Sequence, residues 1–299
     1  MLSSTRVSAT SATVSAAGAG FLAHSLRRLG RMPAAWIGGA IVLLLLGVAL
    51  AGKDATPFDP LRIAPVDKLL QPSAAHPFGT DDLGRDLLSR VIAGARISLL
   101  VGVLVLTIAM SVGVGLGLVA GYWGGWVDEA IMRTTDIFLS FPRLVLAIAI
   151  AATLGPGLYN AMVAVALSWW PWYTRLVRGQ LLSLREQEFV QAAVSLGAGR
   201  PRILLRHLLP NVATTVVIEA SIDFGYAILA TASLSFIGLG AQPPTPEWGS
   251  IIAQARSYMI DAWWFPTFPG LAIFLAVVGF NLLGDAVRDA FDPRLRSAR

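Results

Sequence analysis

Six long apolar segments constrain this chain more than any other feature of its sequence. They run over residues 34–52, 97–122, 137–154, 158–173, 213–239 and 265–283. A helix that crosses about 30 Å of hydrocarbon needs about 20 residues at 1.5 Å each, so each segment is a candidate membrane span. Apolar residues make up 55% of the chain and charged residues 14%, and the mean hydropathy is +0.66, as in polytopic membrane proteins. The sequence predicts an all-α membrane protein with six transmembrane helices.

The first span contains Ala49, Leu50 and Ala51, an A-x-A pattern like that of a signal-peptidase site. However, its apolar run is longer than the hydrophobic region of a typical signal peptide, and about 33 residues precede it. We therefore expect an uncleaved anchor. Cleavage would leave five spans and the same core.

The positions of the basic residues predict the orientation. Sixteen of the 23 Lys and Arg residues lie in the tails and loops that are inside if the N-terminus is cytoplasmic, and seven lie outside. Acidic residues neutralise those of the first outer segment. By the positive-inside rule, both termini are expected in the cytoplasm.

These spans divide the chain into four parts. We expect a disordered cytoplasmic tail over 1–33, the first transmembrane helix over 34–52, an extracytoplasmic segment over 53–96, and a five-helix core over 97–299 with a cytoplasmic loop at 183–210. Gly155, Pro156 and Gly157 connect the third and fourth spans, and this composition predicts a tight turn between antiparallel helices.

Composition also argues against several kinds of site. The chain has no cysteine, and its three histidines, His24, His76 and His207, lack the close spacing of a metal-binding helix. No glycine-lysine motif for nucleotide phosphates occurs, so the chain is not expected to hydrolyse ATP or to bind a cofactor. Its basic residues lie at the ends of apolar spans, which argues against nucleic acid as a partner.

The basic loop at 183–210 is the most informative part of the sequence. Apolar residues recur at helical spacing up to Leu196, are interrupted by Gly197, Gly199 and Pro201, and then resume, which predicts helix, turn, helix. Gly197 suits a left-handed cap at the end of the first helix. Its arginines would face lipid headgroups or acidic residues of a partner. An ordinary amphipathic hairpin at the membrane surface is the alternative interpretation.

This loop resembles the conserved cytoplasmic loop of ABC importer permeases. Gln191-Ala192-Ala193 is followed four residues later by Gly197, and Leu209-Pro210 follows at the family's spacing. Further segments resemble the C-type permease subunit of dipeptide and oligopeptide importers: HPFGTDDLGRD (76–86), GARISL (94–99), GYWGGWVDE (121–129), LSFPRL (139–144), RHLLPN (206–211) and LSFIGLGAQPPTPEWG (234–249). The likeness covers about residues 76–296.

The resemblance implies a type I ABC importer permease (MetI-like) fold in a bacterial cytoplasmic (inner) membrane. It implies a related B-type permease, two cytoplasmic ATPases that use ATP and Mg, and an extracytoplasmic binding protein as partners, with alternating access as the mechanism. In the family the loop forms the coupling helix, which sits in a cleft of the ATPase. The residues carried over are Glu188, Gln191, Ala192, Ala193, Gly197, Ala198, Gly199, Arg200 and Pro201. Gln191 replaces the family's usual acidic residue and His207 its isoleucine, and Glu188 lies one turn earlier.

The fifth span carries two carboxylates, Glu219 and Asp223, on one helical face. Carboxylates at membrane depth usually face a bundle interior or an aqueous path. We expect Asp223 to line the translocation path, with a structural hydrogen bond or ion pair as the alternative. An ion-coupled carrier that uses this pair is a rival function, as are import of nickel or another solute and a membrane scaffold.

Two further regions allow more than one interpretation. Trp169, Trp170 and Trp172 are interpreted as an aromatic belt at the membrane interface. In the outer segment, residues 79–86 predict a turn that leads into a capped helix. This turn and the proline-rich loop at 242–247 would dock the binding protein or pack against the companion permease.

Overall fold

The computed structural model describes residues 27–291 of the 299-residue chain, and this part is almost wholly helical. Within it, β-structure is limited to one bridge between Thr80 and Asp86. The predicted all-α class is therefore confirmed for the described residues, whereas residues 1–26 of the predicted tail lie outside them. The helices are α2 (Pro33–Ala51), α3 (Leu87–Trp123), α4 (Gly125–Leu139), α5 (Arg143–Leu154), α6 (Leu158–Arg185), α7 (Glu188–Ser195), α8 (Arg200–Ile203), a π-helical turn η3 (Leu204–Leu208), α9 (Leu209–Phe236), α10 (Trp248–Ala255) and α11 (Trp264–Phe291), with short 3₁₀ turns η1 (Gly52–Ala55), η2 (Pro65–Asp67) and η4 (Arg256–Tyr258).

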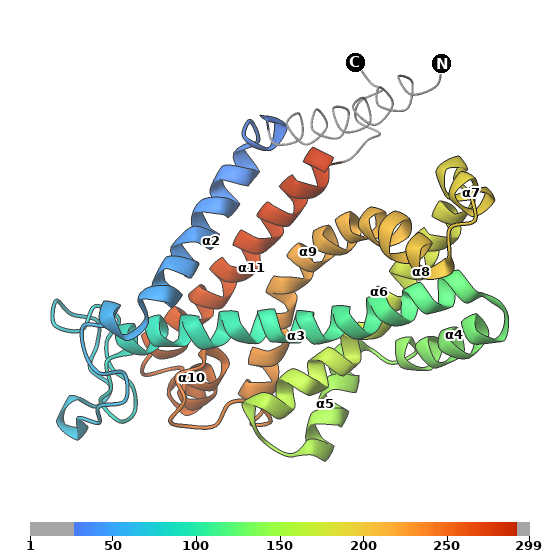
Figure 1. Cartoon of the computed structure of the whole chain (residues 1–299). Coiled ribbons are helices and arrows are strands. Elements are labelled where there is room, and N and C mark those ends of the chain that lie inside the picture. The colour runs from blue at the N-terminus through green and yellow to red at the C-terminus, as the bar shows by residue number, and fades with distance from the viewer. Residues whose placement is uncertain (1–26, 292–299) are drawn as a thin grey trace.

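The long helices form one bundle with two distinct ends. The start of α2, the end of α11 and the α7–α8 region lie toward one end, and the 52–86 segment and α10 lie toward the other (Figure 1). α2 lies along α11, and α3 packs along α6. The arrangement places the basic loop and the outer segment on opposite sides of the bundle.

Glycines on α3 bring its backbone close to α6. Gly113, Gly117 and Gly121 recur every four residues, and a Cβ on any of them would lie 2.6–2.8 Å from atoms of α6. Helix pairs in membranes depend on such small residues, because apolar side chains gain little by leaving lipid for a protein interior. The contact therefore depends on the absence of side chains on this face of α3.

Two apolar clusters fill the bundle. The first joins α3, α5, α6 and α9, and it also includes Val190 and Ile203 from the α7–α8 region. The second joins α2, α3, α9, α10 and α11 around the buried Trp248 and Phe265. α3 and α9 contribute to both clusters and hold the two halves of the bundle together.

Four helical stretches among residues 27–291 are long and apolar enough to cross a membrane: α2, α3, Arg200–Phe236 and the part of α11 over Trp264–Ala290. The α4–α5 pair makes a fifth if it is one span, although its helices are bent by 91°. α6 is not among these spans, because Asn160 near its start and Arg175 and Arg178 in its second half lower its hydropathy. The predicted count of six spans is not confirmed by length and composition.

The predicted span at 137–154 has a different course in the structure. α4 ends at Leu139 and α5 begins at Arg143, since Pro142 disfavours helical backbone at the preceding residue. α5 has 12 residues and spans only about 18 Å, less than the hydrocarbon thickness. The turn through Gly155 and Gly157, both with positive φ, joins α5 to α6 as expected.

α3 begins well before the predicted start of its span at residue 97. Asp86 caps the helix, since its carboxylate accepts a hydrogen bond from the Ser89 amide at 2.8 Å. At 37 residues and about 55 Å, α3 is longer than the membrane is thick. The predicted capped turn at 79–86 is confirmed, and α3 extends beyond the bilayer.

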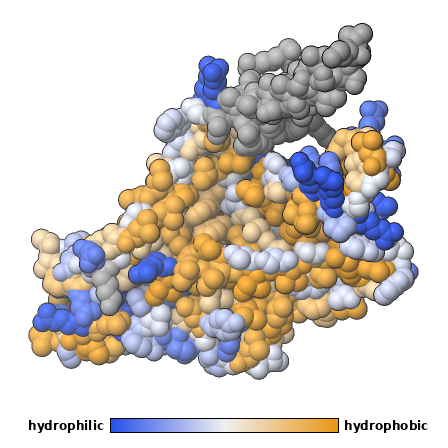
Figure 2. All heavy atoms as spheres, viewed as in Figure 1, coloured by the Kyte–Doolittle hydropathy of each residue, from blue (hydrophilic) through white to orange (hydrophobic). Residues whose placement is uncertain are grey.

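Apolar residues cover much of the visible surface, and hydrophilic residues gather toward its ends (Figure 2). On α2 the exposed apolar side chains include Trp36, Leu43 and Leu50, with 69%, 70% and 86% of their surface accessible. A soluble monomer rarely exposes so much contiguous apolar area. The surface is therefore that of a protein surrounded by lipid.

Candidate functional site

The α7–α8 region forms a compact elbow between α6 and α9. α7 ends in a Schellman motif, in which the Ala198 amide donates to the Ala193 carbonyl at 3.0 Å and the Gly197 amide to the Val194 carbonyl at 2.9 Å. Gly197 has φ = +74°, a conformation that suits glycine because it has no Cβ. The predicted helix, turn, helix and the left-handed cap are both confirmed.

One face of the elbow is anchored in the bundle. Val190 and Ala193, three residues apart on α7, are buried, as is Ile203 at the end of α8. Val190 and Ile203 belong to the cluster that joins α3, α5, α6 and α9. Displacement of the elbow therefore disturbs the packing of the long helices.

The rest of α7 is exposed and mixes apolar side chains with the polar Glu188, Gln191 and Ser195. Leu196 is 87% exposed, Val194 57% and Phe189 43%, and Ala192 is exposed beside them. α7 therefore presents a solvent-accessible side at the tip of a loop, away from the spans.

The residues of α7 that the resemblance singles out lie on different sides of the helix. Ala193 faces the bundle because it lies one turn after Val190, whereas Ala192 is exposed. Gln191 is exposed and its side-chain amide donates to the Glu186 carbonyl at 3.2 Å. Glu188 is exposed in the first turn of α7, where the helix dipole favours a negative charge.

The remaining predicted residues form the turn and the start of α8. Ala198 is half-buried, Gly199 precedes the helix with φ = −65°, and Arg200 and Pro201 are exposed in its first turn. From Arg200 onward the chain stays helical through the π turn into α9, and Leu208 within it is fully buried. The elbow is thus continuous with α9 through a helical connection.

The two carboxylates of α9 both bind aromatic side chains of α6. Tyr173 donates its hydroxyl to Asp223 at 2.9 Å, and the Trp172 indole donates to Glu219 at 2.8 Å. Asp223 and Tyr173 are buried, and Glu219 is half-buried. The pair joins α6 to α9 in the middle of both helices.

Arg143 is close to this pair and was not identified from the sequence. Its guanidinium lies over the rings of Trp169 and Trp172, at 5.3 Å and 4.9 Å from their centroids. Trp169 and Trp170 are buried, because α6 is surrounded by other helices. The interpretation of these tryptophans as an interfacial belt is wrong for these two.

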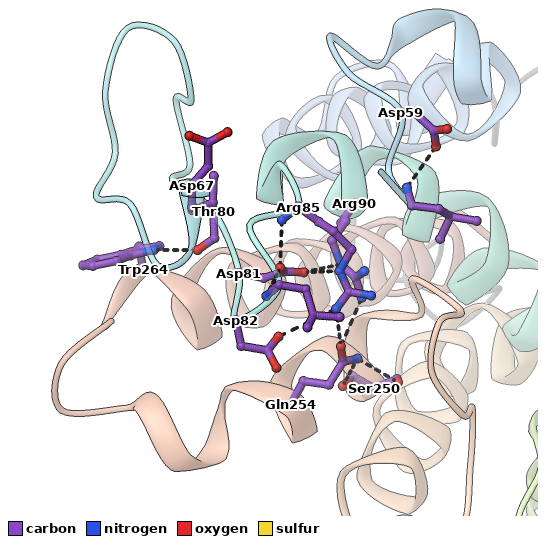
Figure 3. Close-up of polar contacts among 12 residues, drawn as sticks. Asp59, Asp67, Thr80, Asp81, Asp82, Arg85, Arg90, Ser250, Gln254 and Trp264 are labelled. Atoms are coloured by element: carbon purple, nitrogen blue, oxygen red, sulfur yellow. Dashed lines mark hydrogen bonds and ion pairs between the residues drawn. The ribbon is translucent and has the colours of Figure 1, made fainter. Parts of the chain in front are cut away.

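The outer segment is tied to the bundle by a buried polar cluster (Figure 3). Asp81 binds Arg85 at 2.6 Å and lies 3.3 Å from Arg90, and the side chain of each of the three is at most 2% exposed. Arg85 also donates to Gln254 of α10 at 2.8 Å. These side chains are used within the chain, so they do not form a docking surface of their own.

Further hydrogen bonds strengthen the outer cap, by which we mean the 52–86 segment together with α10. Trp264 of α11 donates to the Thr80 carbonyl at 3.2 Å. Glu247 caps α10 by accepting hydrogen bonds from the Gly249 and Ser250 amides at 2.9 Å and 2.8 Å. Burial raises the pKa of the Glu247 carboxyl, and these amides oppose that rise.

Comparisons with known proteins agree with this arrangement. Residues 113–297 match the family described as binding-protein-dependent transport system inner membrane component. The chain is 50% identical to the probable D,D-dipeptide transport system permease protein DdpC of Escherichia coli, over 85% of both chains. It is 44% identical to the dipeptide transport system permease protein DppC of Alkalihalophilus pseudofirmus, over 92% of this chain and 90% of the relative.

Two further comparisons cover a third relative and a solved structure. The glutathione transport system permease protein GsiD of Pectobacterium atrosepticum is 46% identical over 91% of this chain and 90% of its own length. The fold matches an inward-facing structure of the methionine ABC transporter MetNI with a TM-score of 0.56 and 20% identity, over 68% of this chain and 97% of that one. With its helical elbow and apolar spans, the chain belongs to the family of binding-protein-dependent transport system inner membrane components.

Proposed function

We propose that this chain is the permease subunit of an ATP-driven importer that moves di- or oligopeptides into the cytoplasm. The elbow at α7–α8 carries the proposal, because its anchored face and its exposed outer residues fit a part that receives force from another subunit. The relatives DdpC, DppC and GsiD are described by their names as permeases for dipeptides and for glutathione, itself a tripeptide. Peptide-like solutes are thus common to the relatives.

The proposed assembly contains a related B-type permease, two cytoplasmic ATPases and an extracytoplasmic binding protein. ATP and Mg are used by the ATPases, and this chain contributes no catalytic residue. Nucleotide binding favours one state of the permease pair and hydrolysis releases it, so the solute path is open to one side at a time. The residues of the elbow, from Glu188 to Pro201, form the contact with the ATPase.

The proposed orientation puts both termini and the elbow in the cytoplasm of a bacterium and the 53–86 segment outside. The two ends of the bundle seen in Figure 1 agree with the excess of Lys and Arg in the tails and inner loops. α6 runs beside α3 through the same layer, and we assign it as the sixth span. The packing of α2 on α11 through Gly38 and Gly279 favours an anchor that is retained.

The pair Glu219 and Asp223 is proposed to border the solute path. Their hydrogen bonds to Trp172 and Tyr173 occupy one lone pair each and leave carboxylate oxygen available to a cationic group. A peptide ammonium is such a group. In this structure Asp223 is held against α6, so it would meet the solute when α6 and α9 separate.

Reconstitution of the complete transporter in proteoliposomes tests the proposal. Uptake of a labelled dipeptide should require ATP, the ATPase subunits and the binding protein together. Uptake driven by an ion gradient without ATP would instead identify a secondary carrier. Uptake of nickel but not of peptides would refute the assigned substrate and leave the ATP-driven mechanism standing.

A further inference from the structure

A pocket of about 310 Å³ lies behind the elbow, between it and the C-terminal ends of α3 and α6. α3 supplies Tyr122 and Trp123, and α6 supplies Arg185. The elbow closes the other side with apolar side chains and one cation, from Val190, Val194, Arg200 and Ile203. The pocket thus joins three separate elements.

The two arginines of this pocket have no acidic partner in the part of the chain that the structure describes. Among residues 27–291, neither Arg185 nor Arg200 forms an ion pair, and no acidic residue lines the pocket. Elsewhere on α6, by contrast, Arg175 binds Asp136 and Arg178 binds Asp128 at 2.5 Å. The pocket therefore carries a net positive charge that the described part of the chain does not neutralise.

Arg185 is held in position for a ligand. One of its terminal nitrogens donates to the Gly121 carbonyl at 2.9 Å, and its guanidinium lies 5.9 Å from the centroid of the Tyr122 ring. A guanidinium has five N–H donors, so most of them stay available. A fixed fork of donors matches the oxygens of a phosphate group.

The pocket lies where α3 ends, and exposed aromatic side chains surround this end. Trp123 is 49% exposed and Trp126, at the start of α4, is 80% exposed. Tryptophan at the end of a span marks the level of the lipid headgroups. In the proposed orientation this is the cytoplasmic leaflet, and basic pockets between helices on that side bind anionic headgroups.

We infer that this pocket binds the phosphate headgroup of an anionic phospholipid from the cytoplasmic leaflet. Arg185 and Arg200 hold the phosphate from two sides, and the exposed Val194 and Trp123 contact the glycerol and the first acyl carbons. Inorganic phosphate offers the same charge but no carbon atoms for these two side chains to contact. The assignment to the cytoplasmic leaflet rests on the proposed orientation.

A bound headgroup would connect the end of α6 to the start of α8. It would therefore stabilise the elbow against the bundle and make coupling depend on lipid composition. The binding itself is separate from transport. A transporter that fails to move peptides can still be tested for the lipid.

Photolabelling tests this site on the complete transporter in nanodiscs. The discs contain phosphatidylcholine with a small fraction of phosphatidylglycerol that carries a photoreactive group near the phosphate. After illumination the permease is digested, and the fragments that carry the label are identified by mass spectrometry. We expect labels on the end of α3 and on α7. Arg185→Gln should lower them about tenfold at sub-saturating lipid, because one charge-assisted contact is lost.

Two further variants separate binding from misfolding. Arg200→Gln changes an exposed side chain and should lower the labelling similarly, even if Arg185→Gln does not assemble. Arg206→Gln, an exposed arginine of the same loop that does not line the pocket, should leave it unchanged.

Other outcomes overturn the inference. Equal labelling by a matched phosphatidylcholine probe would exclude selectivity for anionic lipid. Loss of labelling in millimolar inorganic phosphate would identify a site for free anions. Labelling that survives both pocket variants, or a crosslink that places an ATPase carboxylate between the two arginines, would also contradict the lipid assignment.

Discussion

At the scale of single residues, Gly197 has the clearest structural requirement in the elbow. Its φ of +74° lies in the left-handed region, and a Cβ there would meet no neighbouring atom within 4 Å. Substitution at this position is therefore limited by backbone strain and not by space. The glycine allows the chain to leave α7 and begin α8 within a few residues.

Gly197→Val should uncouple ATP hydrolysis from uptake, and Gly197→Asn should retain most of the coupling. Left-handed backbone costs ordinary residues about 1–2 kcal/mol and β-branched residues more, whereas asparagine adopts it readily. The measurement is the ratio of solute moved to ATP hydrolysed in proteoliposomes. Equal ratios for the two variants would show that the backbone conformation of Gly197 is irrelevant to coupling.

Asp223 is the residue where a role in the solute path can be separated from a structural one. Asp223→Asn removes the charge but still accepts the hydrogen bond from Tyr173, so the fold should persist. We expect the KM for a dipeptide with a free ammonium to rise about tenfold, and that for an N-acetylated dipeptide to stay the same. Unchanged uptake and unchanged substrate preference in this variant would mean that Asp223 has only a structural role, as the partner of Tyr173 between α6 and α9.

The sequence predicted the position of Gly197 and the shared face of Glu219 and Asp223, since both follow from local rules. It did not predict Trp172 and Tyr173 as their partners, because those residues are 47 and 50 positions away along the chain. The burial of Ala193 was missed for the same reason. Which face of a short helix meets the bundle depends on tertiary contacts.

At the scale of elements, α3 and α6 form the most extensive helix contact among the described residues. Gly117 faces α6, where a Cβ would lie 2.7 Å from the Val177 Cβ and 2.8 Å from the Thr174 carbonyl. Gly115, two residues earlier, faces away, and a Cβ there would meet nothing within 4 Å. The two positions form a matched pair on one helix.

Gly117→Ala should destabilise the assembled permease by about 1–3 kcal/mol, because the added methyl overfills the contact between helices. Gly115→Ala should be neutral or slightly stabilising, since alanine favours helix over glycine. Thermal unfolding of the purified complex measures both. A Gly115 variant as unstable as the Gly117 variant would contradict the assigned packing face.

Two ion pairs of α4 differ in burial, and only the more buried one joins α4 to α6. Arg178 binds Asp128 through two hydrogen bonds of 2.5 Å and 2.7 Å, and the side chains are 30% and 17% exposed. The pair of Arg133 with Glu129 within α4 is 3.7 Å long, and its side chains are 76% and 70% exposed.

Asp128→Asn should lower the stability of the complex by about 1.5–3 kcal/mol, as expected for a charged hydrogen bond that is partly shielded from water. Glu129→Gln should change it by at most about 0.5 kcal/mol, because exposed pairs contribute little. The stabilities of the two variants are compared by denaturing each complex and using the release of the companion subunits as the readout. Equal effects would mean that α4 is not held by its contact with α6.

Element boundaries were the weakest part of the sequence prediction. Hydropathy placed a span across residues 137–154, but Pro142 ends helical geometry there and the chain turns by 91°. Hydropathy likewise missed the first turns of α3. These turns carry the polar Ser89 and Arg90, which are buried under the outer segment and not in contact with lipid. Apolarity indicates contact with lipid. A prediction from hydropathy therefore ends a helix too early where the helix extends into polar surroundings.

At the scale of the whole molecule, the fold class and the family were accessible from sequence, because composition and ordered motifs extend over most of the chain. The polar cluster of the outer cap was not accessible, since it joins Asp81 and Arg85 to Gln254 across 169 positions. Only the folded chain brings these groups together.

Site-directed crosslinking in the complete transporter tests the central claim most directly. The chain has no cysteine, so a single Ala192→Cys provides one reactive site on the exposed face of α7, and Val66→Cys, 94% exposed at the other end, is the matched control. In membranes, a thiol-specific crosslinker should join Ala192→Cys to an ATPase subunit, with a yield that changes with nucleotide, and should leave Val66→Cys unattached to it. Crosslinking of Val66→Cys to the ATPase, or labelling of Ala192→Cys by an impermeant reagent from outside the cell, would contradict the account.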